Sequence, residues 1–261
     1  MKLRGENVSL MDSGASSRLA LLAQRLRAAR RISVLTGAGI SAASGVPTFR
    51  DENGLWRSYR PEDLATPQAF ARDPALLWEW YGWRRELLAR CAPNPAHEVL
   101  ARWSRQDERT TVVTQNVDDL HLKAGTARLV RLHGSIWEVS CSIGCCEEGR
   151  TPRRDERVPM PRLPRCPHCD AVARPAVVWF GEMLADADLR AAVQATVCDV
   201  FLTVGTSSLV YPAAGLVEQA RHHGAFTVEI NAEATPATAV VDLAIRGGAE
   251  VVLPEVDRLL A

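Results

Sequence analysis

Five cysteines lie close together in the sequence with the spacing of a metal site. Cys166 and Cys169 form a C-x2-C pair, and Cys141, Cys145 and Cys146 lie upstream of it. Four thiolates complete the tetrahedral coordination of zinc and leave no open position, so such a site is structural rather than catalytic. We expect Cys141, Cys146, Cys166 and Cys169 to be the ligands, although Cys145 also has a compatible spacing. The alternative is a set of buried free cysteines.

A glycine-rich turn indicates a second kind of chemistry, the binding of a diphosphate. Gly37-Ala38-Gly39 follows the apolar run 32–35, as where a buried strand turns into a helix. Glycines let backbone N–H groups approach phosphate, and a helix N-terminus favours negative charge. The dinucleotide fingerprint is only partly met, because Ala42 stands where a third glycine is usual. The stretch 44–51 is rich in glycine and proline and is suited to fold over a bound cofactor. The alternative is a strand–turn–helix without a ligand.

Polar residues follow each of the next predicted strands. Gln115-Asn116-Val117-Asp118 follows 110–114, His133 follows 129–132, Gly205-Thr206-Ser207 follows 200–204, and Asn231-Ala232-Glu233 follows 226–230. Groups that contact ligands in doubly wound sheets lie at the carboxyl ends of strands, and a neutral imidazole there can be a general base. Each segment alone could be a turn, a helix cap or a structural histidine. Their repetition favours one shared crevice.

Composition limits the class of protein. The 261 residues are 47% hydrophobic with a formal net charge of zero, so no strong field for nucleic acid or a membrane is expected. The sequence shows no signal-type apolar core near its start and no apolar run of transmembrane length. Clustered cysteines in such a chain favour metal over disulfides, so we expect a cytoplasmic protein.

The elements that must position these residues alternate between helices and strands. Helices are expected over 16–31, over 61–92 with starts at Pro61 and Pro74, from Pro95 onward, and over 211–222. Strands are expected over 32–35, 110–114, 129–132, 176–180, 200–204, 226–230 and 251–253. This order predicts an α/β fold, a Rossmann-type doubly wound parallel sheet. The Cys-, Pro- and Arg-rich stretch 138–175 reads as a small insertion held together by metal.

Taken in order, several segments resemble the sirtuins, the NAD-dependent protein deacylases of the silent-information-regulator family. They are the stretch 36–56 (TGAGISAASGVPTFRDENGLW), TQNVDDLH, LHGS, the two cysteine pairs, VVWFGE, VGTS and INAE. The resemblance covers about residues 20–255. It implies a Rossmann-type domain built from 16–50, 96–138 and 176–261, and a small domain with a helical part, 51–95, and a zinc-binding part, 139–175. The first cysteine pair is wider than the C-x2-C usual in the family.

The resemblance also implies roles for individual residues. NAD and an acyl-lysine peptide would bind in the cleft between the two domains, with His133 as catalytic base and Asn116 and Asp118 holding the nicotinamide end. The strand Val178-Trp179-Phe180-Gly181-Glu182 would pair with the substrate backbone by strand addition. The implied NAD contacts are Gly37, Ala38, Gly39, Ala42, Thr48, Phe49, Arg50, Trp56, Gln115, Asn116, Val117, Asp118, Gly205, Thr206, Ser207, Asn231, Ala232, Glu233 and Ala249.

The aromatic helix around residues 78–85 indicates which acyl group is removed. Tyr81 and Arg84 are three residues apart and share a helix face. Tyr-x-x-Arg resembles the signature of class III sirtuins, which prefer succinyl- and malonyl-lysine, and the products would be nicotinamide and O-acyl-ADP-ribose. The alternatives are an amphipathic helix in a plain deacetylase with Arg84 reaching solvent, a protein mono-ADP-ribosyltransferase, and a non-enzymatic zinc and dinucleotide binding module.

Overall fold

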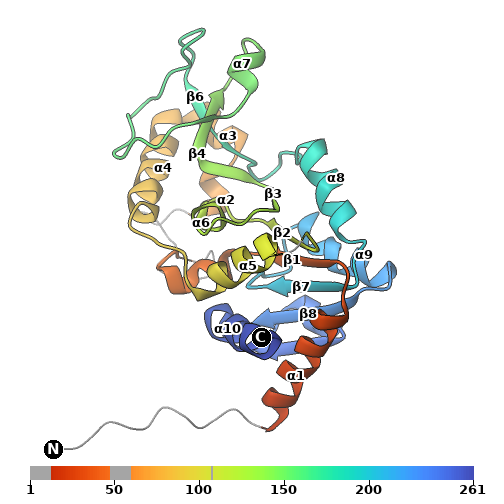
Figure 1. Ribbon diagram of the computed structural model, residues 1–261. Helices are drawn as coiled ribbons and strands as arrows, with labels where there is room; N and C mark the ends of the chain where they lie inside the picture. The colour runs from red at the N-terminus through yellow and green to blue at the C-terminus, as the bar shows by residue number, and fades with distance from the viewer. Residues whose placement is uncertain (1–12, 48–59, 107) are drawn as a thin grey trace, which may run out of the picture.

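The core of the protein is a six-stranded parallel sheet with the order β3-β2-β1-β7-β8-β9 (Figure 1). The computed structural model describes residues 13–47, 60–106 and 108–261. The strands are β1 (Ile32–Thr36), β2 (Thr110–Thr114), β3 (Leu129–Arg131), β7 (Val200–Val204), β8 (Phe226–Asn231) and β9 (Leu243–Arg246). The chain winds from β1 toward β3 and then returns to β7 on the other side of β1. The strand order therefore reverses between β1 and β7, where ligands bind in sheets of this kind.

Helices cover both faces of this sheet because successive side chains of each strand point to opposite sides. Val34 joins a core with α1 (Ser13–Ala28), α5 (Pro95–Gln106) and α10 (Ala249–Leu260). Leu35 joins a second core with α8 (Asp186–Ala195), the 3-10 turn Ala213–Gly215 and α9 (Leu216–His222). The predicted doubly wound α/β fold is confirmed. Within the described ranges, no helix is long and apolar enough to cross a membrane.

A smaller unit combines two separate stretches of the chain. Its helices are α2 (Pro61–Leu64), α3 (Pro67–Arg72) and α4 (Pro74–Leu88), and its antiparallel sheet has the order β5-β4-β6, with β4 (Gly134–Cys141), β5 (Arg153–Arg154) and β6 (Ala173–Val177). Residues of α4, β4 and β6 share one apolar core. The buried Arg85 guanidinium donates to the backbone of Ile136 and Asp155, at 2.8 and 2.7 Å. The helical and the cysteine-bearing stretches are thus packed as one body.

Two of the strand predictions need correction. The run 251–253 lies in helix α10, whose Val252, Leu253 and Val256 have helical spacing and face the core, while Pro254 is accommodated inside the helix. The sixth strand is instead β9. The predicted strand 176–180 is shifted, because β6 ends at Val177 and the residues after it leave the sheet. Apolar runs of three to five residues fit either structure, and packing against neighbours decides between them.

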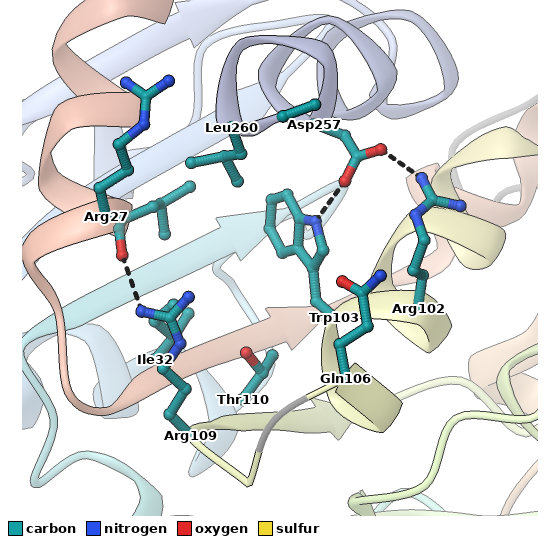
Figure 2. Close-up of a pocket in the computed structure, with 11 residues that line it drawn as sticks. Arg27, Ile32, Arg102, Trp103, Gln106, Arg109, Thr110, Asp257 and Leu260 are labelled. Carbon is teal, nitrogen blue, oxygen red and sulfur yellow. Dashed lines mark hydrogen bonds and ion pairs between the residues drawn. The ribbon is translucent and has the colours of Figure 1, made fainter.

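The helices of one face meet at the amino ends of β1 and β2, around the hollow drawn in Figure 2. Trp103 Nε1 donates to Asp257 Oδ1 at 2.7 Å, and Arg102 pairs with the same carboxylate. Arg109 Nη1 donates to Ala29 O at 2.9 Å, and Arg27 donates to Leu259 O. These arginines satisfy carbonyl groups near helix C-termini, which have no partner within their own helix. The hollow therefore lies where α1, α5 and α10 pack together, at the opposite end of the sheet from the predicted NAD site.

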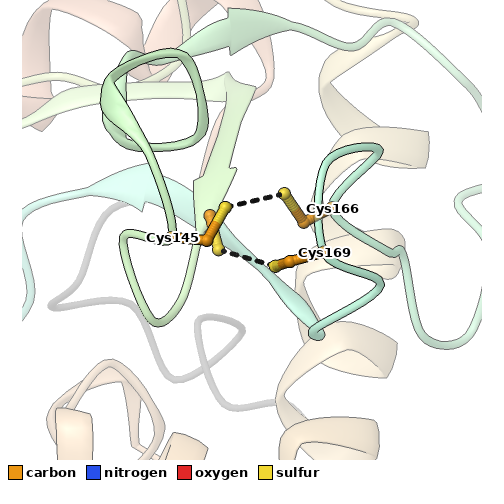
Figure 3. Close-up of side chains that lie close together, drawn as sticks. Cys145, Cys166 and Cys169 are labelled. Carbon is orange, nitrogen blue, oxygen red and sulfur yellow. Dashed lines mark hydrogen bonds between the residues drawn. The ribbon is translucent and has the colours of Figure 1, made fainter.

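Four thiol groups converge at the outer end of the small sheet (Figure 3). The sulfurs of Cys141, Cys145, Cys166 and Cys169 all lie within 4.8 Å of one another. Cys141 Sγ is 3.6 Å from Cys169 Sγ, and Cys145 Sγ is 3.8 Å from Cys166 Sγ. Two Zn–S bonds of about 2.3 Å at the tetrahedral angle place sulfurs about 3.8 Å apart, so the cluster fits zinc.

The structure corrects one predicted zinc ligand, since Cys145 and not Cys146 completes the cluster. Cys146 is the N-cap of the short helix α7 (Glu147–Arg150), and its sulfur accepts the Gly149 N–H at 3.2 Å. The capping contact turns this side chain toward α7, whereas the C-x3-C spacing brings Cys145 to face the C-x2-C pair.

Removal of the metal should unfold the small sheet locally, because the cysteine turns are largely on the surface, with Ile143, Cys145 and Cys169 exposed. We expect Cys145→Ser to lose zinc and to lower the melting temperature by several degrees. The neighbouring Cys146→Ser should retain one full equivalent of zinc per protein chain. Zinc content measured by mass spectrometry and thermal denaturation test this pair. Equal zinc retention in both variants, or an unchanged melting temperature after chelation, would contradict the assignment.

Candidate functional site

Two glycine-rich turns are in direct backbone contact at the carboxyl ends of β1 and β7. The Gly39 N–H donates to Gly205 O at 2.8 Å. A Cβ on Gly37 would lie 2.7 Å from Thr206 Cα, and one on Gly39 would lie 2.8 Å from Gly205 O. Gly205 itself has a φ of +59°. These positions require glycine because the turns pack on each other, and the contact leaves the N-terminal end of the 3-10 helix η1 (Ala38–Ser44) at the crevice.

Side chains from two further strand ends converge on Thr206. Gln115 Nε2, after β2, donates to Thr206 Oγ1 at 2.9 Å. Asn231 Nδ2, at the end of β8, donates to Thr206 O at 2.8 Å. Ser207 is half-buried beside them, while Ala232 and Glu233 are exposed. The structure thus brings together the polar segments that the sequence places after β2, β7 and β8.

Asn116 and Asp118 meet a residue that sequence reasoning missed, Ser41. Asn116 Nδ2 lies 3.0 Å from Gly37 O and 3.2 Å from Ser41 Oγ. The Ser41 hydroxyl donates to Asp118 Oδ2 at 2.7 Å, and the Leu120 N–H donates to Asp118 Oδ1 at 2.8 Å. Burial raises the pKa of Asp118, while these two hydrogen bonds oppose the rise. Ser41 could have been found as the hydroxyl nearest the end of the glycine turn.

His133 has the tautomer of a general base. Its Nδ1 lies 2.9 Å from Gln115 O. A carbonyl oxygen can only accept, so Nδ1 carries the proton and Nε2 keeps its lone pair. Burial lowers the pKa of His133 below its ordinary value, and the hydrogen bond to Gln115 opposes this in part. The imidazole is therefore neutral near pH 7 and able to accept a proton.

Two fully buried histidines lie behind these residues and were not predicted. His97 Nε2 is 3.4 Å from Ser41 Oγ, His121 Nε2 is 3.0 Å from Thr36 Oγ1, and the two rings are 4.9 Å apart. His97 belongs to α5 and His121 to the short helix α6 (Leu120–Lys123). They connect α5 and α6 to Ser41 of η1 and Thr36 of β1. Sequence spacing gave no signal for this pair, because its members come from separate elements.

The predicted acyl-binding residues lie together on α4. Tyr81 is fully buried, and its hydroxyl accepts a hydrogen bond from Trp179 Nε1 at 3.0 Å. Arg84 is half-buried, with its guanidinium carbon 5.0 Å from the Trp80 ring and 5.9 Å from the Tyr81 ring. Burial lowers the pKa of Arg84, and the negative charge of Asp118 acts in the opposite direction. Arg84 on α4 is thus close enough to Asp118 for the two charges to interact.

The segment after β6 already uses most of its backbone donors. The Val178 N–H donates to His133 O at 3.0 Å, the Phe180 N–H donates to Ala65 O at 2.9 Å, and the Trp179 N–H donates to the Glu182 carboxylate at 2.9 Å. Glu182 is held in turn by Arg174. Gly181 and the half-exposed Phe180 face solvent. Strand addition here would therefore depend on carbonyl groups and on the Gly181 amide.

The remaining predicted NAD contacts either have no side-chain hydrogen bond to the residues above or lie outside the described residues. Ala249 opens α10 two residues after Gly247, whose N–H donates to Asn231 O at 3.1 Å. Ala42 is exposed on η1, and Val117 is half-buried. Thr48, Phe49, Arg50 and Trp56 fall in the range 48–59, outside the described residues.

Low pH should destabilise the protein through the buried histidines. Burial lowers the pKa of His97 to about 4 and that of His121 well below its ordinary value. Between about pH 4 and 6.5 the unfolded chain binds more protons, so the free energy of unfolding should fall as the pH is lowered, by at most about 1.4 kcal/mol per pH unit for each histidine. Urea denaturation at several pH values in this range gives the free energy of unfolding as a function of pH. This free energy should fall less steeply with decreasing pH in His97→Gln than in the wild type. An equally steep fall in both would show that His97 does not cause the loss of stability.

Comparison with known proteins identifies the family. The Sir2 family model matches residues 37–212. The chain is 49% identical over 234 residues to NAD-dependent protein deacylase 2 of Pyrobaculum aerophilum. The matched region covers 89% of this chain and 92% of the relative. A crystal structure of a Sir2 homolog–NAD complex superposes with a TM-score of 0.83 at 40% identity and covers 98% of both chains.

A second solved structure, Sir2Af2 bound to a myristoylated histone peptide, superposes with a TM-score of 0.76 at 32% identity, over 94% of this chain and 97% of that one. The matched family model spans the glycine turn, the segment 115–118, His133 and the four-cysteine cluster. The chain therefore belongs to the Sir2 family.

Proposed function

We propose that the protein is an NAD-dependent protein-lysine deacylase that releases nicotinamide and O-acyl-ADP-ribose. The observation that carries this proposal is the neutral His133, whose Nε2 is free of the Gln115 hydrogen bond, at the same edge of the sheet as the paired glycine turns. Family membership and the NAD complex of a related protein support NAD as the co-substrate. The peptide complex of Sir2Af2 supports an acyl-lysine peptide as the second substrate.

The residues of the crevice fit the parts of such a dinucleotide. The N–H groups of Gly37, Gly39 and Gly205 already donate to backbone carbonyl groups, so those of Ala38 and Thr206 would be the ones to contact a diphosphate. Asn231 is the last residue of β8, where a ribose or adenine would lie. Asn116 and Asp118 present an amide and a carboxylate on the other side of the turn, suited to the nicotinamide end. NAD supplies the ribose carbon that accepts the acyl oxygen as nicotinamide leaves.

His133 would remove a proton from the ribose hydroxyls, so that a ribose oxygen can attack the former acyl carbon. Its Nε2 lone pair accepts that proton, while the Nδ1 bond to Gln115 O holds the ring in place and stabilises the imidazolium that forms. Burial of the acyl-lysine side chain beside Tyr81 and Trp179 would keep bulk water away from the reacting atoms.

Loss of His133 should abolish turnover without preventing NAD binding. We expect His133→Ala to lower kcat by roughly two to four orders of magnitude, which is typical for loss of a general base. His222→Ala, at an exposed position at the end of α9, is the matched control and should behave as the wild type. A peptide deacylation assay followed by mass spectrometry and calorimetric titration with NAD measure both steps. Near-normal turnover would exclude His133 from the mechanism, and ADP-ribose attached to the protein would indicate ADP-ribosyl transfer instead.

We propose further that the preferred acyl groups are succinyl and malonyl. Such groups bring a carboxylate to the end of the acyl pocket, where burying it without a partner would be costly. Arg84 can bind a carboxylate through two parallel hydrogen bonds, and the Tyr81 hydroxyl, which accepts the Trp179 N–H, keeps its own proton available for a third. Contact with the aromatic rings of Trp80 and Tyr81 supports the guanidinium on one side.

The acyl preference can be tested with one substitution. We expect Arg84→Met to raise KM for a succinyl-lysine peptide at least tens-fold, because truncating one partner of a buried charged pair costs about 2–5 kcal/mol. Activity on the matched acetyl-lysine peptide should remain largely intact, and Arg90→Met, at an exposed position just after α4, should change neither. Equal losses on both peptides would mean that Arg84 is structural and that the protein is a plain deacetylase.

A further inference from the structure

Asp119 has an unusual backbone conformation for its residue type. Its φ of +63° lies in the left-handed region, which is unfavourable for residues with a Cβ and is tolerated best by glycine, asparagine and aspartate. It is the N-cap of α6, yet its side chain makes no capping hydrogen bond. The side chain is instead 1% exposed and paired with Arg154. A strained residue with a buried charge requires partners that hold it.

Those partners come from the small sheet and from the edge of the large one. Arg154, on β5, donates to Asp119 Oδ2. Arg131, on β3, lies 3.7 Å from Asp119 Oδ1 and 3.0 Å from Glu138 Oε1 on β4. The buried carboxylate therefore lies between guanidinium groups of two sheets: Oδ2 is hydrogen-bonded to Arg154, whereas Oδ1 has no hydrogen bond and only the longer ion pair with Arg131.

The backbone just before Asp119 is bonded to the same small sheet. The Ile136 N–H donates to Val117 O at 2.9 Å, and Trp137 Nε1 donates to Asp118 O at 3.2 Å. Three consecutive residues, 117–119, are thus attached to β4 and β5, the strands that lead to and from the cysteine cluster.

The conformation of Asp119 also sets the direction of the neighbouring carboxylate. Asp118 Oδ1 accepts the N–H of Leu120, two residues later, which is an Asx turn with Asp119 at its centre. The left-handed φ of Asp119 brings the Leu120 N–H back to Asp118. In this arrangement Asp118 Oδ2 reaches Ser41 beside Asn116.

We propose that Asp119 is a positioning residue: its ion pair with Arg154 attaches the segment 116–120 to the small sheet, its ion pair with Arg131 attaches it to β3, and together they fix Asn116 and Asp118 in their working geometry. The inference rests on the proposed deacylase function for its effect on turnover, but its structural part does not. A shift of about 1 Å at such a site typically costs roughly 100-fold in rate.

Substitutions at Asp119, Arg154 and Glu156 test the proposal in the full-length, zinc-loaded protein. Asp119→Asn keeps the size and the tolerance of a left-handed φ but removes the charge. Arg154→Met removes the partner from a side chain that is 42% exposed, so this variant decides the question if Asp119→Asn does not fold. Glu156→Gln is the matched control, since Glu156 pairs with the same Arg154 but is 68% exposed.

The measurements are hydrogen–deuterium exchange of the peptides that cover 114–122, zinc content, and kcat and KM with an acyl-lysine peptide. We expect Asp119→Asn and Arg154→Met to speed exchange of the 117–121 amides and to lower kcat roughly 10-fold to 100-fold, with zinc content and the KM for peptide little changed. The losses of kcat caused by Asp119→Asn and by Arg154→Met should not add when both substitutions are combined in one protein. Arg154→Lys should restore part of kcat, and Glu156→Gln should match the wild type.

A merely structural role predicts a different result. If both variants lose thermal stability while local exchange and kcat stay at wild-type values, the proposal is overturned. The same conclusion follows if Glu156→Gln is as impaired as Arg154→Met. A wild-type protein that fails to deacylate peptides with NAD would refute the proposed function, and local exchange at 117–121 would still decide the role of Asp119.

Discussion

The site depends on the close approach of two backbone turns, where the Gly39 N–H meets Gly205 O at the junction of β1 and β7. This junction is where the strand order reverses, so the turns have no helix crossing between them and can face a ligand together. A side chain on Gly37 or Gly39 would collide with the opposite backbone. The contact in turn places Thr206 where Gln115 and Asn231 reach it, and so ties the ends of four strands to one another.

A buried polar network extends this junction on one side. Ser41 connects Asn116 and Asp118 to His97, and Thr36 connects the start of the turn to His121. Buried polar groups are costly when unpaired, so such a network fixes one geometry rather than adding much stability. Burial lowers the pKa values of both histidines, so protonating either ring would destabilise the folded state. The side chains at the ends of β1 and β2 are therefore held in one arrangement.

The small unit supplies the other side of the crevice and depends on two kinds of interaction. Apolar packing of α4 on β4 and β6 positions the helix that carries Tyr81 and Arg84, and buried Arg85 joins the helical stretch to the sheet. At the far end, where the cysteine turns are largely on the surface, the four thiol groups gather in the geometry of a zinc site. The contacts of Ile136, Trp137 and Arg154 with residues 117–119 then connect this unit to the segment of Asn116 and Asp118.

The sequence by itself determined the parallel sheet, most of its strands and the residues at their ends. Runs such as 110–114 and 200–204 are continuous and β-branched because their strands are buried on both faces, and parallel geometry brings their polar successors to one edge. Local patterns could not decide the helix at 251–253, the choice of Cys145 over Cys146, or the pairing of Ser41, His97 and Asp119 with distant partners. These outcomes depend on which residues, far apart in the chain, come into contact, and only the tertiary packing decides that.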